Sequence, residues 1–483
     1  MTLTTRTLER RQFLRGAAMT AGAVAALPAL RGLSLLGLNG RVYAQPGSGS
    51  YGPLKPTPDL RDGVKRIALP RGFKYRSFSH AGELMFDGNL VPLAHDGMAV
   101  FNMPDARFRL VRNHEDRNAP NNGSAAVDGN AYDIRGGGGT TTLVVNPFTR
   151  ELERDFISLN GTIVNCAGGL TPWGSWITCE ETNAGVPQGW SAQHGYCFEV
   201  PASAESSVPA VPLPAMGRFA HEAVAVDPET GIVYETEDSG DSGFYRFTPN
   251  TPGVLADGGL LEMLKIKNVT NYDTRTDQTV GVPLPVEWVS IATPDPPGQG
   301  SNDVYNQGFA GGAAIFTRLE GCWYGNGAIY FDATNGGDAG EGQIWEYRPH
   351  GNGGYLTLIF ESSGPDVLNS PDNLAFSPQG AILLCEDGDD DQYLRGLTLD
   401  GYIFDFALNL QTDHEWAGAT FALAHPTWNA RAMRGNNPPL VDEEDRITLF
   451  VNRQGSTSGS NPPSAGNEGM TFAIWGPWGN GAL

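Results

Sequence analysis

The sequence predicts an all-β fold, a six-bladed β-propeller with long inserted loops. Three observations favour it: many turn-forming residues, many short runs of strand-like sequence, and acidic clusters spaced along the chain. The 483 residues include 63 Gly and 34 Pro, and 10% are aromatic. This composition is typical of short strands joined by tight turns, and helical periodicity is scarce after residue 44.

The strand-like runs are short, are either apolar or alternating, and end close to Gly, Asn, Asp or Pro. The last runs, 447–451 and 472–474, are candidates to pair with strands near the N-terminus. Long loops are expected at 252–300 and 455–467, which are rich in Pro, Gly, Asn and Asp. The other expected strands are 107–111, 140–145, 176–179, 195–200, 223–226, 232–236, 243–247, 328–332, 343–347, 355–359, 381–385 and 401–406.

A loose repeat recurs along the chain. A strand that begins with Gly ends in an acidic loop, and an aromatic-rich strand and a turn follow. The repeat starts at Gly231, Gly327 and Gly380. Repetition of a unit of a few strands every few tens of residues predicts a propeller. A pair of all-β sandwiches is the competing architecture.

Six clusters combine strand sequence with acids, which suggests one cluster for each blade. Because the inner strands of a propeller meet at its central channel, these carboxylates would converge there. Without cations they would repel and raise one another's pKa, and bound ions remove that cost. The clusters are 112–115, 178–181, 217–223, 318–321, 372–373 with 385–387, and 415–418.

Two residues point to chemistry within these clusters. Cys179 directly precedes Glu180 and Glu181, and a soft thiolate beside hard carboxylates suits an iron-class metal next to a calcium-class metal. A buried structural cysteine is the alternative. Arg318 lies two residues before Glu320 and so shares its face of a strand. It could hold an anionic oxygen of a substrate, or it could form a salt bridge with Glu320.

Residues 1–44 read as a twin-arginine signal peptide. Arg10 and Arg11 precede an apolar segment, and small residues up to Ala44 provide a cleavage site. We therefore expect a periplasmic or secreted protein that meets the twin-arginine translocation machinery during export. Residues 45–483 would form a single β-propeller catalytic domain.

The net charge of the chain limits the classes of molecule that it can bind. The chain has 32 Lys+Arg and 54 Asp+Glu, and without residues 1–44 its net charge is −27. Such a charge argues against nucleic acid and anionic membranes and suits calcium, whose ligands are carboxylates. No second segment is apolar enough for stable membrane insertion, and we expect a monomer. Of the five cysteines, four remain to pair or stay buried once Cys179 is assigned to metal.

Several motifs taken together resemble the PhoX-type alkaline phosphatases, from about residue 50 to the end of the chain. The resemblance implies a six-bladed propeller, twin-arginine export, a buried cluster of two ferric ions and about three calcium ions, and activity on phosphate monoesters. The motifs are Asn165–Gly169, Thr171–Trp176, Thr178–Glu181, His221–Ala223, Arg318–Gly321, Asp372–Leu374 and Thr471–Trp478.

The resemblance also implies roles for individual residues. Arg318 would hold the phosphate. The family adds a lysine to this clamp, but no Lys follows Lys267 here, so Arg453 and Arg434 are the candidate substitutes. The implied metal ligands are Cys179, Glu222 and Glu320 for iron and Glu180, Asn373 and Glu386 for calcium, with Glu115 and Glu415 as further ligands.

The expected function is therefore an exported metal-dependent phosphatase whose partner is a small-molecule phosphate ester. Two alternatives stay open at this point. One is a calcium-dependent propeller hydrolase acting on phosphodiesters, phosphotriesters or lactones. The other is a non-catalytic, calcium-stabilised exported binding protein.

Overall fold

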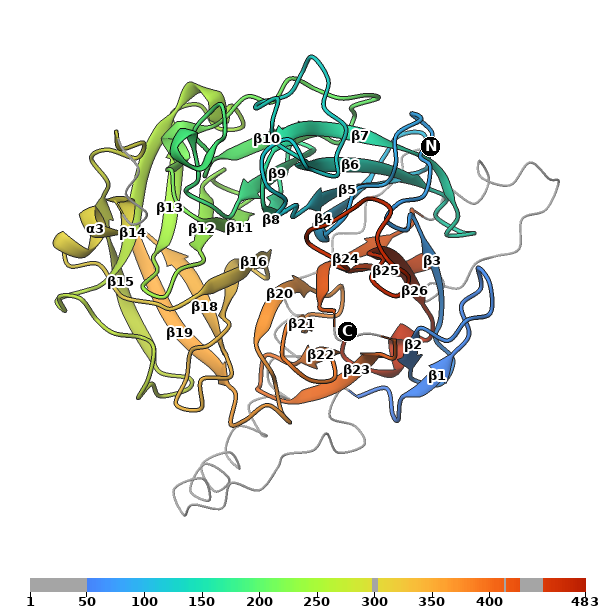
Figure 1. Ribbon diagram of the computed structural model, residues 1–483. Helices are drawn as coiled ribbons and strands as arrows, with labels where there is room; N and C mark the ends of the chain where they lie inside the picture. The colour runs from blue at the N-terminus through green and yellow to red at the C-terminus, as the bar shows by residue number, and fades with distance from the viewer. Residues whose placement is uncertain (1–49, 298–302, 412–413, 426–445) are drawn as a thin grey trace, which may run out of the picture. The chain divides into compact units, whose positions relative to one another are not determined.

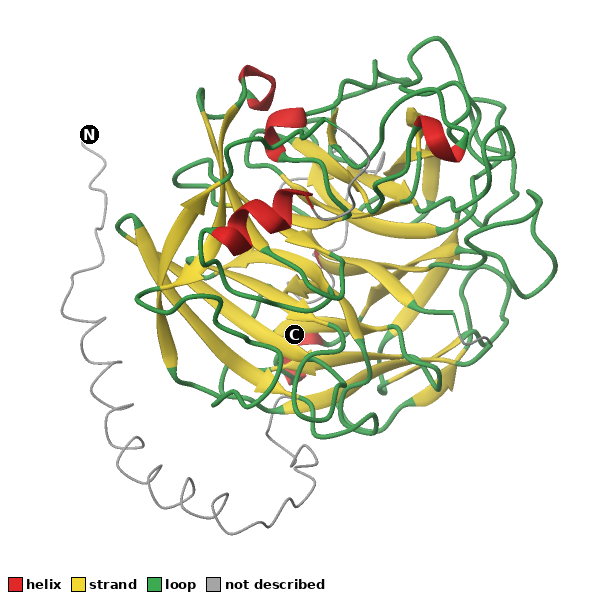
Figure 2. Ribbon diagram, turned by 60° about the vertical axis from the view of Figure 1, so that its left-hand side comes forward, coloured by secondary structure: helices red, strands yellow, loops and turns green. Residues whose placement is uncertain are grey.

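A computed structural model describes residues 50–297, 303–411, 414–425 and 446–483. The predicted signal peptide and Arg434 lie outside these residues. The regular secondary structure of the described chain is almost entirely strand, with one α-helix, α3 (Asp303–Ala310), and a few single 3₁₀ turns, as Figure 2 shows. Among these residues no helix combines the length and apolar composition needed to cross a lipid bilayer. The 3₁₀ turns are Val186–Gln188, Pro214–Met216, Leu255–Asp257 and Trp478–Asn480.

The described strands form five antiparallel sheets. The first contains β4 (His95–Asn102), β5 (Phe108–His114), β6 (Gly138–Val145) and β7 (Leu152–Thr162). The second contains β8 (Asn165–Leu170), β9 (Ser175–Glu180) and β10 (Cys197–Pro201). The third contains β1 (Lys55–Thr57), β2 (Ile67–Leu69), β20 (Pro371–Phe376), β21 (Ile382–Glu386), β22 (Tyr393–Leu397) and β23 (Ile403–Asn409).

The fourth sheet joins the two ends of the described chain. It contains β24 (Trp416–Leu423), β25 (Ile447–Arg453), β26 (Met470–Trp475) and β3 (Lys74–Phe78). The pairing of β26 with β3 aligns Thr471 with Phe78 and Trp475 with Lys74. This confirms the predicted pairing for the run 472–474, whereas the run 447–451, in β25, pairs with β24 and β26 instead.

The fifth sheet has nine strands. Two four-stranded meanders lie in it, and β15 (Pro283–Ser290) pairs with the outer strand of each. The other strands are β11 (His221–Val226), β12 (Val233–Glu237), β13 (Phe244–Pro249), β14 (Gly259–Ile266), β16 (Leu319–Gly325), β17 (Ala328–Ala333), β18 (Gln343–His350) and β19 (Gly353–Glu361).

These sheets correct two predictions. The sequence predicts six separate blades, whereas the described strands form five hydrogen-bonded sheets, because β15 bridges two meanders into one. The segment 252–300 was predicted to be a long loop, but it contains β14 and β15. The many turn residues around these strands obscured them in the sequence, although β14 buries Leu261 and Met263 almost completely. Each strand predicted from sequence overlaps an observed one.

The arrangement is propeller-like. The first strand of each four-stranded unit lies innermost, and the remaining strands stack outward from it (Figure 1). Successive innermost strands contact one another, and the last contacts the first, which closes a ring. Apolar side chains fill the space between neighbouring sheets, with Trp176 and Trp416 among the largest that are fully buried. The ring runs β4, β8, β11, β16, β20 and β24.

Candidate metal centre

Each innermost strand begins with a break in its ladder. In β4 the register shifts between His95 and Met98, and equivalent shifts occur near the starts of β8, β11, β16, β20 and β24. A bulge adds an unpaired residue and re-aims its side chain. Five of these bulges each contain one residue that carries a metal-ligating group: Asp96, Cys166, Glu222, Glu320 and Asp372.

A small residue follows most of these ligating residues, because neighbouring inner strands approach closely. A Cβ on Gly97 would lie 2.6 Å from the Cα of Ala167, and one on Gly321 would lie 2.8 Å from the backbone nitrogen of Leu374. No larger side chain fits there without movement of the backbone. A ligating residue followed by Gly or Ala is therefore a signal that could have located the site from sequence.

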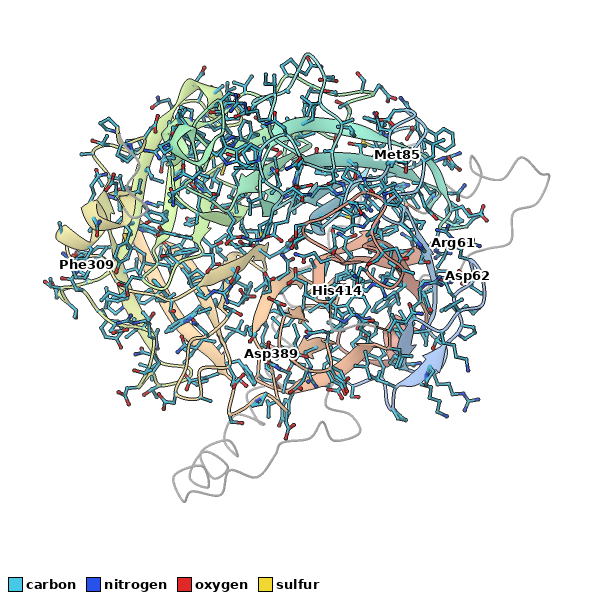
Figure 3. The ribbon with its side chains drawn as sticks, in the orientation of Figure 1. Arg61, Asp62, Met85, Phe309, Asp389 and His414 are labelled. Atoms are coloured by element: carbon cyan, nitrogen blue, oxygen red, sulfur yellow. The ribbon has the colours of Figure 1, made fainter. Side chains whose placement is uncertain are left out.

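A second group of acids follows the second strand of several units. The residue that ends the strand points away from the ring centre, and the next residue points toward it, as the two-residue period of a strand requires. The residues in this second position are Glu115 after β5, Glu181 after β9, Asp238 after β12 and Asp387 after β21. The loop after β21 and the loop before β24 can be followed in Figure 3 from the labelled Asp389 and His414.

Together the two groups form one continuous cluster, which we call the central cluster. It consists of overlapping groups of three residues whose ligand atoms lie within 4.8 Å of one another. Cys166, Glu222 and Asp372 each belong to two of these groups and so connect them. The members are eight carboxylates and one thiol: Asp96, Glu115, Cys166, Glu181, Glu222, Glu320, Asp372, Asp387 and Glu415.

Hydrogen bonds satisfy only part of the central cluster. The Cys166 thiol donates to Glu222 Oε1 at 2.9 Å. Gln454 Nε2 donates to Asp96 Oδ2 at 3.0 Å and to Glu115 Oε2 at 2.8 Å. Within the described chain, Glu222 Oε2 and Glu415 Oε1 are buried and have no hydrogen-bond partner. Such unpaired buried oxygens are costly unless a cation binds them.

Electrostatic repulsion within the central cluster also favours the binding of cations. Burial first, and then the neighbouring carboxylates, raise the pKa of Asp96, Glu222 and Asp372 well above the usual range. Burial raises the pKa of Glu115 to about 7. Two carboxylates about 4 Å apart repel by roughly 4 kcal/mol at an effective dielectric constant of about 20. Oxygen donors suit hard cations, and the single thiol suits a softer one.

Two arginines contact the central cluster from its accessible side. Arg318 Nε lies 3.0 Å from Asp238 Oδ1, and its Nη2 lies 2.6 Å from Glu320 Oε1. Arg117 forms ion pairs with Glu115 and Glu181. The side chains of Arg318 and Arg117 are 41% and 47% exposed, whereas Glu320 and Glu115 are almost fully buried. Solvent-accessible cations therefore border a buried anionic site.

The structure brings together five of the residues singled out from sequence. Glu115, Glu222, Glu320 and Glu415 belong to the central cluster, and Arg318 contacts it. The ion pair of Arg318 with Glu320, weighed as an alternative, is present. Sequence reasoning placed Glu181, Asp372 and Asp387 in its acidic clusters but did not name them as metal ligands, and it gave no role to Asp96, Cys166 or Arg117.

Cys179 does not lie in the central cluster, contrary to the prediction. Its side chain is fully buried in an apolar core with Met216 and Phe219, and its Sγ lies 3.6 Å from Cys197 Sγ. The thiol of the cluster is Cys166 instead. Cys179 lies in the regularly paired part of β9, where its side chain packs in the core between the second sheet and β11, whereas Cys166 lies in the bulge of β8 and belongs to the central cluster.

Glu180 and Glu386 also lie outside the central cluster. In each case the next residue in the chain belongs to it instead. Both end a second strand and bind the adjoining loop. Glu180 accepts hydrogen bonds from the backbone of Ile163 and Gly195 and contacts His194 Nδ1 at 2.6 Å. Glu386 accepts from Arg395 Nε at 2.8 Å and from two backbone amides. Their neighbours Glu181 and Asp387 face the centre instead.

Arg453 is the remaining correction, whereas the role of Asn373 as a calcium ligand stays a prediction. Asn373 pairs with Cys385 in the regular ladder, and its neighbour Asp372, the extra residue of the bulge, belongs to the central cluster. Arg453 is 1% exposed and donates to the backbone carbonyl of Glu468 and to Gln411. It therefore does not replace the missing lysine at the central cluster, where Arg117 is the additional cation.

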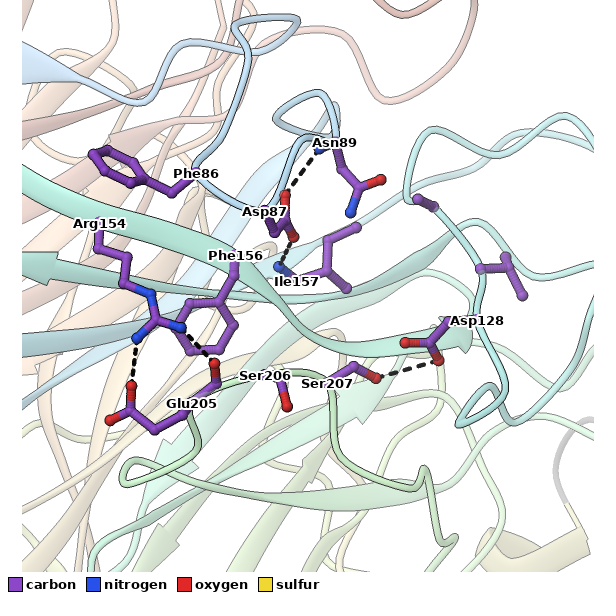
Figure 4. A pocket seen from close by; sticks show the side chains of 12 residues that line it. Phe86, Asp87, Asn89, Asp128, Arg154, Phe156, Ile157, Glu205, Ser206 and Ser207 are labelled. Atoms are coloured by element: carbon purple, nitrogen blue, oxygen red, sulfur yellow. Dashed lines mark hydrogen bonds and ion pairs between the residues drawn. The ribbon is translucent and has the colours of Figure 1, made fainter.

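A surface pocket of about 370 Å³ lies elsewhere, against β7 (Figure 4). Its charged groups are satisfied by hydrogen bonds or by an ion pair. Asp87 accepts backbone hydrogen bonds from Asn89 and Ile157, each at 2.9 Å, and Arg154 forms an ion pair with Glu205. Because these charges are satisfied, the pocket is not the candidate site.

The chain is similar to known phosphatases and propellers. The family model described as alkaline phosphatase PhoX matches residues 49–428. A structure of Pseudomonas fluorescens PhoX in complex with vanadate, a transition-state analogue, has 17% identity and a TM-score of 0.62, and the match covers 90% of this chain and 99% of that one.

Other similarities are more distant. A catalytically inactive virginiamycin B lyase from Staphylococcus aureus has 11% identity and a TM-score of 0.38, with 83% and 99% of the two chains covered. None of the curated protein sequences compared matches the chain. The family match spans more than half of the chain and includes every residue of the central cluster, which confirms the resemblance seen in the sequence motifs. The chain belongs to the PhoX family of alkaline phosphatases.

Proposed function

We propose that this protein is an exported, metal-dependent phosphatase that hydrolyses phosphate monoesters at the central cluster. One observation carries the proposal: eight carboxylates and one thiol, six of them from buried residues, converge in one site, and two partly exposed arginines border it. This arrangement offers ligands for several cations and positive charge for an anionic substrate. Family membership supports the reaction class.

The proposed cofactors are two ferric ions and about three calcium ions. Cys166 and the adjacent Glu222 would hold iron, since a thiolate is a soft donor. The carboxylates on the other side, including Asp372 and Asp387, would hold calcium through oxygen. When bound, these ions would supply Lewis-acid activation and neutralise charge on the phosphoryl group.

The two arginines would bind the phosphoryl oxygens. Burial opposes ionisation of Arg318, but the Glu320 and Asp238 carboxylates raise its pKa above the usual range. It therefore remains charged throughout the working pH range. Its planar fork matches two oxygens of a phosphoryl group. Arg117, which forms an ion pair with Glu181, would take the place of the lysine that the family adds to the phosphate clamp.

We propose further that each four-stranded half of the nine-stranded sheet acts as one blade, so that the six inner strands represent six blades. Residues 1–44 would direct the chain to the periplasm or outside the cell, and residues 45–483 would act there as a single domain and a monomer.

The assay that tests the function uses protein purified from its export route and supplied with calcium and ferric iron. We expect hydrolysis of an aryl phosphate monoester, with much weaker action on phosphodiesters, phosphotriesters and lactones. Inactivity on the monoester despite full metal content would refute the proposal. A preference for diesters would instead favour the alternative hydrolase.

Replacing Arg318 with alanine should lower kcat/KM by about 100-fold, because the variant loses a charge-assisted contact with the phosphoryl group in the transition state. Iron and calcium content should stay unchanged. Steady-state kinetics and elemental analysis check both expectations. Arg348→Ala is the matched control, since Arg348 is 44% exposed and forms an ion pair with Glu346, two residues away, on β18. Loss of metal from Arg318→Ala would assign Arg318 a structural role.

Replacing Arg117 with alanine should raise KM by about tenfold, with a smaller change in kcat, because the loss of an exposed charge weakens substrate binding. Arg117→Lys should recover part of the substrate affinity, since lysine restores the positive charge but not the planar guanidinium group that can bind two oxygens. Unchanged KM in Arg117→Ala would remove this residue from the substrate site.

A further inference from the structure

A second group of ligating side chains lies away from the central cluster, on the opposite side of β11. Ligand atoms of Cys197, His221 and Glu235 lie within 4.8 Å of one another, and all three residues are fully buried. Cys179 lies directly opposite Cys197 in the β9–β10 ladder. These four residues, which we call the cysteine–histidine site, come from two different sheets.

Three distances in the cysteine–histidine site match those of a tetrahedral zinc site, although Cys179 Sγ lies outside the group of atoms that are all within 4.8 Å of one another. Zinc–ligand bonds of typical length place two sulfurs about 3.8 Å apart, sulfur and nitrogen about 3.6 Å apart, and nitrogen and oxygen about 3.4 Å apart. The Sγ atoms of Cys179 and Cys197 are 3.6 Å apart. Cys197 Sγ lies 3.5 Å from His221 Nδ1, which lies 3.4 Å from Glu235 Oε2.

The histidine is held in the orientation that a metal ligand needs. His221 Nε2 lies 3.1 Å from the backbone carbonyl of Gly217, and a carbonyl can only accept. Nε2 therefore carries the proton, and in the neutral ring Nδ1 presents its lone pair to Cys197 and Glu235. A backbone carbonyl that fixes the tautomer in this way is a common feature of metal-ligating histidines.

The carboxylate supplies an independent indication of a ligand. Glu235 is 0% exposed, and among the described residues neither of its side-chain oxygens has a hydrogen-bond partner. Burial raises its pKa well above the usual range. An unpaired buried carboxyl group costs free energy, whereas coordination to a cation would satisfy it.

We propose that the cysteine–histidine site is a second metal site that binds one zinc ion, with one ligand atom each from Cys197, His221 and Glu235 and a fourth from Cys179 after a small side-chain rotation. Two thiols, an imidazole and a carboxylate favour zinc over calcium. The ion links the three-stranded sheet to β11 and β12 of its neighbour. Its role is therefore structural, and the inference does not depend on the proposed activity.

The test is zinc analysis of full-length protein, together with anomalous diffraction from its crystals at the zinc edge. We expect one zinc per chain and an anomalous peak between β10 and β12. Cys197→Ser should lose this zinc and keep its iron and calcium. Cys385→Ser is the matched control: Cys385 is fully buried too but lies in a different core, so that variant should keep the zinc.

Three results would overturn the inference. The wild type could contain no zinc, its zinc could lie elsewhere in the anomalous map, or mass spectrometry could find a disulfide between Cys179 and Cys197. Because the diffraction experiment uses the wild type, it decides the question even if Cys197→Ser fails to fold.

Discussion

Replacing Cys166 with alanine is expected to remove iron from the protein and to lower phosphatase activity by more than about 100-fold. Cys166 belongs to two of the overlapping ligand groups in the central cluster, and its Sγ lies 2.9 Å from Glu222 Oε1. Loss of an outer-shell partner alone typically costs 10–100-fold in metal affinity or activity, and a direct soft ligand should matter more. Iron content and turnover of an aryl phosphate check the result.

The other cysteines make this prediction specific. Cys385→Ala removes an equally buried thiol and should retain iron and activity. Cys179→Ala should retain iron as well, because this thiol lies in an apolar core. If Cys179→Ala lost iron and Cys166→Ala kept it, the sequence-based assignment would stand and the placement of the cluster would be wrong.

Removing the bound ions should reverse the pH dependence of stability. In the ion-free protein, burial raises the pKa of the cluster carboxylates above their unfolded values, as for Glu115, which moves from 4.5 to about 7. The stability that such a group contributes is fully present below its unfolded pKa. It is lost as the pH rises through the folded pKa. Glu115 alone accounts for about 3 kcal/mol.

We therefore expect the melting temperature of chelator-treated protein to fall as the pH rises from about 4.5 to above 7. The ion-loaded protein should keep its stability over the same range, because fewer protons then compete with the ions for the carboxylates. Thermal unfolding followed by circular dichroism, with and without calcium and iron, measures both curves. A melting temperature of the ion-free protein that rises with pH would contradict the repulsion argument.

A single substitution separates repulsion from ion binding. Glu222→Gln removes one charge from the cluster, so it should raise the melting temperature of the ion-free protein at pH 8 and weaken ion binding. Glu346→Gln is the control, because Glu346 lies on β18 and pairs with Arg348. It should change neither property.

Composition and local pattern were sufficient for the fold class and for the general nature of the site. Short strands, frequent Gly and Pro, and recurrent acidic segments predicted an all-β, propeller-like fold, and strands such as β12 and β17 lie where the alternation placed them. The same reasoning located Glu222 and Glu320 and the cation beside them, Arg318. These features depend on residue type and on a period of two, which a sequence displays directly.

The choice between adjacent residues depended on the folded ring. Glu181 rather than Glu180 and Asp387 rather than Glu386 face the centre, because each follows the last paired residue of a strand. Bulges turn Cys166 and Asp372 inward. A bulge shifts the alternation by one residue, and it forms where neighbouring inner strands crowd together. Contacts between distant segments cause that crowding, and its trace in the sequence is limited to the small residue, such as Gly97 or Gly321, that follows most of the ligating residues.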